Sequence, residues 1–160
     1  MRIVIDQSPR IENWTKSSVI AFANGQEKAI ILPATLKREC LDILHDRGVT
    51  EGAAKWMILA AGIVVLIRYH LTQINSVVID LEFDRRTMYQ MREWLYGKLI
   101  YEWRQQKVSP RFILRDISFD SVGRKHRAHQ LAYGLYTGRT KSRQDLRVKS
   151  REILSLFKDR

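Results

Sequence analysis

Residues 75–84, with the sequence NSVVIDLEFD, are the stretch from which the organisation of the whole chain can best be inferred. The β-branched run at its start is typical of a buried strand. Three acids follow at alternate positions, Asp80, Glu82 and Asp84. Because strand side chains alternate between two faces, these carboxylates should project from one side, where they repel one another unless a cation lies among them. The stretch therefore predicts a divalent metal site on a strand.

Chain length and charge indicate one basic domain. The chain has 160 residues, enough for a single domain with a substantial core. Its net charge of +11 and pI near 10.1 indicate a polyanionic partner, most often nucleic acid, with an anionic membrane surface as the weaker alternative. The last 50 residues hold 13 Lys and Arg against 5 Asp and Glu. We therefore expect a basic C-terminal region, about residues 124–160, to contact nucleic acid.

Cysteine usage and hydropathy favour a cytoplasmic protein. The single cysteine, Cys40, excludes an intramolecular disulfide and a Cys-based zinc site. The start, MRIVID, reads as a strand rather than as the apolar region of a signal peptide. The most apolar run, residues 57–67, is too short to span a bilayer. We predict no membrane association.

The remaining elements follow from periodicity and from capping signals. Asn24-Gly25 between two apolar runs predicts a β-hairpin, since both residues tolerate the positive φ of a tight turn. Thr35 and Thr50 are candidate helix N-caps, and Asp84 is another. Strands are predicted at residues 2–6, 17–24, 28–32, 75–84 and 111–119. Helices are predicted at residues 35–48, 51–71, 86–106, from about 125, and near the C-terminus.

This order, β-β-β-α-α-β-α-β-α, predicts an α/β domain with a mixed five-stranded sheet flanked by helices. The first strand should be central, because the parallel fourth strand needs a partner after its helical crossover. The helix at 51–71 is apolar around most of its circumference, which is typical of a buried helix.

This order of elements, together with four short motifs, resembles the ribonuclease H-like superfamily, which includes ribonuclease H and the RuvC-type Holliday-junction resolvases. They are Asp6 in IVIDQS, the acids of VVIDLEF, Glu39 in LKRECLDIL, and AHQLA at residues 128–132. The resemblance implies one ribonuclease H-like domain over residues 1–160. It also implies metal ligands at Asp6, at Asp80 or Glu82, at His129, and at Glu39 in the ribonuclease H branch. His129 stands where the family more often has an acid, and the smallest ribonucleases H lack the helix at 51–71.

The expected chemistry is phosphodiester hydrolysis with two Mg²⁺ or Mn²⁺ ions, which supply a nucleophilic water and neutralise developing phosphate charge. Lys125 and His126, one helical turn before His129, are candidates for contacting the scissile phosphate or assisting proton transfer. Sequence-independent contacts to the nucleic-acid backbone are expected from the basic residues of the C-terminal region. These are Arg124, Lys125, Arg127, Arg139, Lys141, Arg143, Arg147 and Lys149.

Several alternatives stay open. The substrate could be a DNA junction, cut by a homodimer whose contact face would be the apolar helix 51–71, or the RNA strand of an RNA–DNA hybrid. A protein that keeps the fold but only binds nucleic acid is the rival from another class. Individually, Asp6 could cap a turn, Glu39 could be an ordinary surface residue, and His126 and His129 could be structural.

Overall fold

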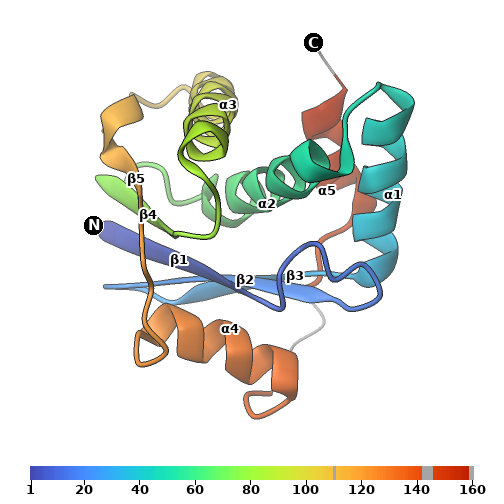
Figure 1. The fold of residues 1–160 in the computed structure, drawn as a ribbon. Coiled ribbons are helices and arrows are strands. Elements are labelled where there is room, and N and C mark those ends of the chain that lie inside the picture. The colour runs from blue at the N-terminus through green and yellow to red at the C-terminus, as the bar shows by residue number, and fades with distance from the viewer. Residues whose placement is uncertain (110, 142–145, 159–160) are drawn as a thin grey trace.

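The structure, a computed structural model, describes residues 1–109, 111–141 and 146–158. It is an α/β fold with a five-stranded mixed sheet flanked by helices (Figure 1). The strands are β1 (Arg2–Ser8), β2 (Ser18–Ala23), β3 (Lys28–Leu32), β4 (Ser76–Asp80) and β5 (Ile117–Asp120). The helices are α1 (Ala34–Asp46), α2 (Glu51–Ile67), α3 (Arg85–Gln106), α4 (Arg127–Thr137) and α5 (Ser150–Leu154), with short 3₁₀ turns at Leu114–Asp116 and Ser155–Phe157.

The first strand is central, as predicted. The spatial order is β3-β2-β1-β4-β5. β1 pairs antiparallel with β2 and parallel with β4, while β5 continues the parallel side. The carboxyl ends of β1, β4 and β5 therefore meet at one edge, which is where open α/β sheets usually bind ligands.

Local signals read from the sequence account for two of the connections. Asn24 and Gly25 adopt φ values of 101° and 97°, which confirms the hairpin between β2 and β3. The Thr50 side chain accepts a hydrogen bond from the amide of Ala53, which confirms the N-cap of α2. The predicted cap at Thr35 is wrong, because α1 begins one residue earlier, after Pro33, without a side-chain cap.

The two faces of the sheet are covered unequally. Figure 1 shows α1, α2, α3 and α5 on one face and α4 alone on the other. Most of the 17 residues of α2 are buried. Gly62 allows this helix to lie close to the sheet, since a Cβ atom there would clash with Ile20 Cδ1. Because α2 is enclosed within its own chain, it cannot be the dimer face that its apolar sequence suggested.

Three predicted boundaries are wrong, each where a loop competes with regular structure. The strand at 75–84 ends at Asp80, because the next residues turn toward α3 and Phe83 packs against the core. The strand at 111–119 is reduced to β5, because Asp116 accepts a hydrogen bond from the Ile113 amide and stabilises a 3₁₀ turn. The apolar helix stops at Ile67 rather than at residue 71.

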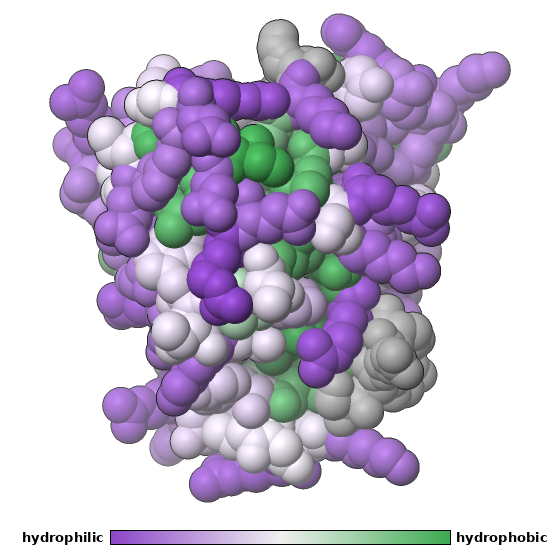
Figure 2. Space-filling model, turned by 90° about the vertical axis from the view of Figure 1, so that its right-hand side faces the viewer, coloured by the Kyte–Doolittle hydropathy of each residue, from purple (hydrophilic) through white to green (hydrophobic). Residues whose placement is uncertain are grey.

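The surface is largely hydrophilic on the side shown in Figure 2, where green hydrophobic areas are small and lie between polar side chains. Within the described ranges, no helix combines the length and the apolar character that crossing a bilayer requires.

Candidate metal centre

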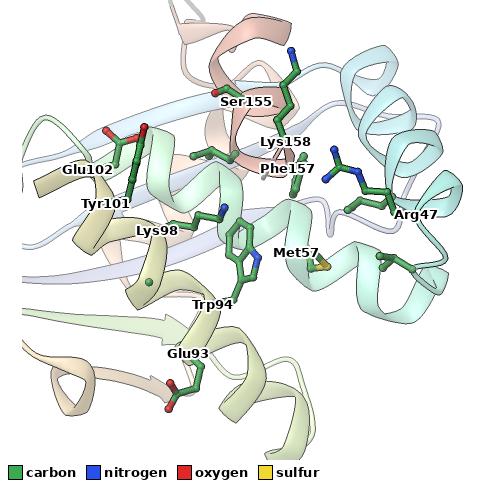
Figure 3. Close-up of a pocket in the computed structure, with 14 residues that line it drawn as sticks. Arg47, Met57, Glu93, Trp94, Lys98, Tyr101, Glu102, Ser155, Phe157 and Lys158 are labelled. Carbon is green, nitrogen blue, oxygen red and sulfur yellow. The ribbon is translucent and has the colours of Figure 1, made fainter. Parts of the chain in front are cut away.

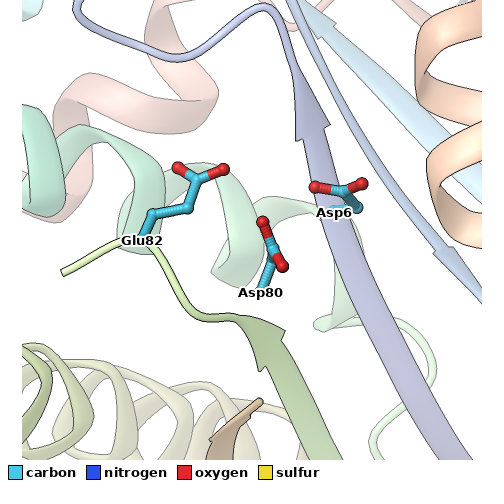
Figure 4. Close-up of side chains that lie close together, drawn as sticks. All are labelled: Asp6, Asp80 and Glu82. Atoms are coloured by element: carbon cyan, nitrogen blue, oxygen red, sulfur yellow. The ribbon is translucent and has the colours of Figure 1, made fainter. Parts of the chain in front are cut away.

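Three acids from two distant segments converge at the carboxyl edge of the sheet. Ile5 and Ile79 are register partners, so Asp6 on β1 lies beside Asp80 at the end of β4. Glu82 joins them from the loop after β4, and carboxylate oxygens of the three residues lie within 4.8 Å of one another. Figure 4 shows the three carboxylates pointing toward one another. The predicted juxtaposition of Asp6 with the acidic stretch is therefore present.

The site lies on the sheet face that α4 covers. Asp6 pairs with Ala21, and Ala21 packs against Ala132 of α4. Asp80 lies on the same face as Asp6, because side chains alternate along each strand and the two strands are in register. Glu82 is not part of the strand, so its proximity depends on the loop and not on the alternation that the sequence suggested.

Protonation offsets the mutual repulsion of these acids. Asp6 is 4% exposed, and burial raises the pKa of its carboxyl. Burial, together with a hydrogen bond that protonated Glu82 donates to Asp80, raises the pKa of Glu82 to about 8. Glu82 is therefore mainly protonated at neutral pH when no cation is bound. A bound cation would replace that proton, so metal affinity should increase with pH.

His129 is hydrogen-bonded to Asp6. Its Nδ1 lies 2.8 Å from Asp6 Oδ2, while Asp6 Oδ1 accepts a hydrogen bond from the Gln7 amide at 2.8 Å. α4 thus brings His129 of the AHQLA motif to Asp6 of β1. Among the described residues, however, the group within 4.8 Å contains only the three acids, so His129 adjoins this group through Asp6 without belonging to it.

Gln7 is a site residue that the sequence analysis missed. Its side-chain nitrogen donates to Glu82 Oε2, and its oxygen accepts from the Ile11 amide at 3.1 Å. Gln7 is 8% exposed and is thus one of the few buried polar residues. Gln7 thereby holds the Glu82 carboxyl group in place and links it to the loop between β1 and β2. The only feature of the sequence that could have indicated this role is that Gln7 directly follows Asp6.

Lys37 fixes the other end of the same connection. It is fully buried, and its Nζ donates to the Asn13 carbonyl and to Ser18 Oγ, both at 2.8 Å. Burial lowers the pKa of Lys37 to about 8. This connection carries Arg10, whose Nε lies 3.9 Å from Glu82 Oε2. The ion pair is loose, and Arg10 is 63% exposed, so it offsets little of the negative charge.

Other predicted site residues lie elsewhere. Glu39 is exposed on α1 and accepts a hydrogen bond from Ser150, so it does not join the acids. His126 caps α4 by accepting from the Ala128 amide, and Lys125 is exposed just before it. Asp84 caps α3 by accepting from the Thr87 amide, as expected.

Asp120 is a further acid that the sequence analysis missed. It ends β5 and is the register partner of Asp80, so it lies on the same face at the same edge. It is exposed and lies outside the three-acid group. The predicted strand stopped one residue before it, which is why its position at a strand end was not recognised.

The described basic residues lie on several different elements. Arg127 pairs with Glu27 of the β2–β3 turn. Arg147 forms an isolated backbone β-bridge with Ile31 of β3. It therefore lies at the β3 edge of the sheet, two strands away from β1. Arg124, Lys141 and Lys149 are exposed, and Arg143 lies outside the described residues. Of the basic residues, Arg124 and Arg139 line a pocket beside His129.

We call this cavity the α4 pocket. Its volume is about 700 Å³. Tyr133 stacks on His129, with ring centroids 5.9 Å apart and planes 10° apart, and the Arg139 guanidinium lies 5.5 Å from the Tyr133 ring centre. The described residues that line the pocket include no acid; they are Ser8, Arg124, His129, Gln130, Tyr133, Gly134, Arg139 and Thr140.

A second pocket, of about 750 Å³, lies among the helices on the opposite side of the sheet (Figure 3). Its lining is mixed: Trp94 and Phe157 are aromatic, and the charged residues are the acids Glu93 and Glu102 and the cations Arg47, Lys98 and Lys158. It contains neither the three-acid group nor His129. Unlike the α4 pocket, it is lined by acids as well as by cations.

No family model, no curated protein and no solved structure matches this chain.

Proposed function

We propose that this protein is a metal-dependent nuclease of the ribonuclease H-like fold, which hydrolyses phosphodiester bonds in structured nucleic acid in the cytoplasm. The observation that carries the proposal is the convergence of Asp6, Asp80 and Glu82 within 4.8 Å in a chain of net charge +11. Asp6 is buried and Asp80 and Glu82 are partly buried, and a divalent cation would reconcile the acids with one another and with a polyanionic substrate.

The topology supports the proposed fold. In the family that the motifs resemble, three antiparallel strands are followed by a helix, by a fourth strand beside the first, and by alternating helix and strand. The sheet order β3-β2-β1-β4-β5 is compatible with that arrangement, with the departure that two helices, α1 and α2, lie between β3 and β4. α4, with His129 beside Asp6, would be the closing helix of the family.

The donor set fits Mg²⁺ or Mn²⁺. All three groups are carboxylates, and hard divalent cations prefer such oxygen ligands. Asp6, Asp80 and Glu82 would hold the metal. The bound metal would supply Lewis-acid charge stabilisation at the phosphate and a more acidic water.

The residues around the acids have separate roles in this proposal. Gln7 orients the Glu82 carboxylate, and the Gln7 amide and His129 together fix both oxygens of Asp6. Since His129 Nδ1 is engaged by Asp6, its Nε2 is the atom available to exchange a proton with the substrate or with water. Glu39 is not needed for this arrangement.

The test is cleavage of labelled RNA–DNA hybrid, four-way junction, single-strand and duplex substrates in Mg²⁺ or Mn²⁺. We expect wild type to cleave at least one substrate, and Asp6→Asn to reduce the rate roughly 10³-fold or more. Asp84→Asn is the matched control, because Asp84 is a nearby acid outside the group and asparagine also caps helices well.

The same assay decides between a junction and a hybrid as substrate. Absence of cleavage by wild type on all four substrates, with tight binding by wild type and Asp6→Asn, would contradict the nuclease proposal. The protein would then be a non-catalytic nucleic-acid-binding protein. Size measurement in solution separately tests the homodimer expected of a resolvase, whose contact face cannot be α2.

A further inference from the structure

The α4 pocket adjoins the acids through shared residues. Ser8 follows Asp6 by two positions in β1, so both side chains lie on the face toward α4. His129 both contacts Asp6 and lines the pocket. A ligand that occupied the pocket would therefore lie next to the three-acid group.

The turn after α4 places Arg139 at this pocket. Gly138, with φ of 79°, ends the helix, and the Thr140 amide then donates to the Gly134 carbonyl at 3.0 Å. Gly134 leaves room for the Thr140 side chain, because a Cβ atom there would be 2.6 Å from Thr140 Oγ1. The chain thus folds back against its own helix, and Arg139 is placed over Tyr133.

The lining selects for an anion. Arg124 and Arg139 are cationic, the Ser8 hydroxyl and the Gln130 amide can donate, and the described lining residues include no carboxylate. Arginine is well suited to phosphate, because its planar group donates two parallel hydrogen bonds. A volume of about 700 Å³ is in the range of small-molecule sites and exceeds what a bare phosphate needs.

We propose that the α4 pocket is a phosphate-binding subsite, which holds a backbone phosphate of the nucleic-acid strand next to the bond at the acids. Arg124 and Arg139 bind the phosphate. Tyr133 positions Arg139 through its ring, and His129 separates this phosphate from the acidic group. This inference rests on the proposed function for its substrate, but the phosphate site can be tested without cleavage.

The experiment is an NMR titration of the full ¹⁵N-labelled chain without divalent metal. The probes are inorganic phosphate, thymidine 5′-monophosphate, an eight-residue oligothymidylate, and thymidine as the probe without phosphate. We expect saturable shifts at the Gln130, Gly134 and Thr140 amides with the three phosphate-containing probes and none with thymidine. Arg139→Gln should weaken phosphate binding roughly 10-fold or more.

Lys141→Gln is the matched control, because it removes one positive charge two residues away, outside the pocket lining. It should change the affinity by less than about twofold. Shifts spread over the basic surface, with equal losses for both variants, would overturn the subsite. Affinity no greater for the oligothymidylate than for the monophosphate would overturn its assignment to a strand.

Failure of this proposal is distinguishable from failure of the nuclease proposal. Cleavage that depends on Asp6, without phosphate binding at the pocket, would remove the subsite alone. Phosphate binding that depends on Arg139, without cleavage of any substrate, would remove the nuclease and leave the subsite.

Discussion

The two faces of the sheet differ in how much apolar surface they bury. The face under α1, α2, α3 and α5 holds most of the buried apolar residues, which form one continuous cluster. The α4 face holds a small cluster with five buried members: Val19, Ala21, Ile31, Ala132 and Leu135. The candidate site lies on this second face. A thin apolar layer leaves room for one buried and two partly buried acids, a histidine and a polar pocket, while the thick layer supplies the stability that such groups reduce.

The largest effect expected from this contrast concerns two matched leucines. Leu99→Ala, in α3 on the thick layer, should lower the free energy of unfolding by about 2–5 kcal/mol, since Leu99 is fully buried and a cavity would remain. Leu135→Ala, in α4, should lower it by about 1–2 kcal/mol, because its surroundings are thinner and 8% of its surface is exposed. Urea unfolding measures both, and equal losses would contradict the unequal layers.

A smaller effect is expected at Gln7, which faces the thick layer but orients an acid of the site. Gln7→Leu should keep the fold and weaken Mn²⁺ binding roughly 10- to 100-fold, because Glu82 loses the partner that orients it. Calorimetric titration measures the affinity. Gln26→Leu, at an exposed amide in the β2–β3 turn, is the control and should bind as wild type does. Equal affinities for all three proteins would show that Gln7 has no part in metal binding.

The smallest effect concerns pH and the protonation of Glu82. The pKa of the Glu82 carboxyl is about 8 in the folded chain, against an ordinary value of 4.5. Between pH 4.5 and pH 8, Glu82 is therefore protonated in the folded state and ionised in the unfolded state. Wild-type stability should therefore fall as pH rises from about 4.5 to 8. Glu82→Gln removes this loss and should be more stable than wild type at pH 8.

Thermal unfolding in EDTA at pH 5 and at pH 8 measures this difference, with a shift of a few degrees expected at pH 8. Added Mn²⁺ should reverse the order by stabilising wild type more, since ligand binding to the folded state adds to its stability. Wild type that remains less stable than Glu82→Gln in saturating Mn²⁺ would contradict a metal role for this carboxylate.

Much of the architecture could be predicted from local patterns. Asn24-Gly25 forms the expected hairpin, Thr50 and Asp84 are the expected caps, and β1 is the central strand. The hairpin and the caps depend on a few neighbouring residues, so the sequence carries them directly, whereas the place of β1 followed from the order of the elements. The strand boundaries were harder to predict from the sequence. Asp80 and Ile117 border loops that are stabilised by specific contacts, and the periodicity of apolar residues does not indicate such contacts.

The candidate site divides in the same way. The amino-acid sequence by itself determined which groups are available: an acid on the first strand, acids after the fourth, a histidine on a late helix and an excess of positive charge. Tertiary structure alone decided that Glu82 and Asp80 both approach Asp6, that Gln7 orients one of them, and that Glu39 points elsewhere. It also decided that Arg139, and not Arg127, lines the pocket. The physical reason is that these contacts join residues far apart in the chain, so they exist only once the sheet and its helices have packed.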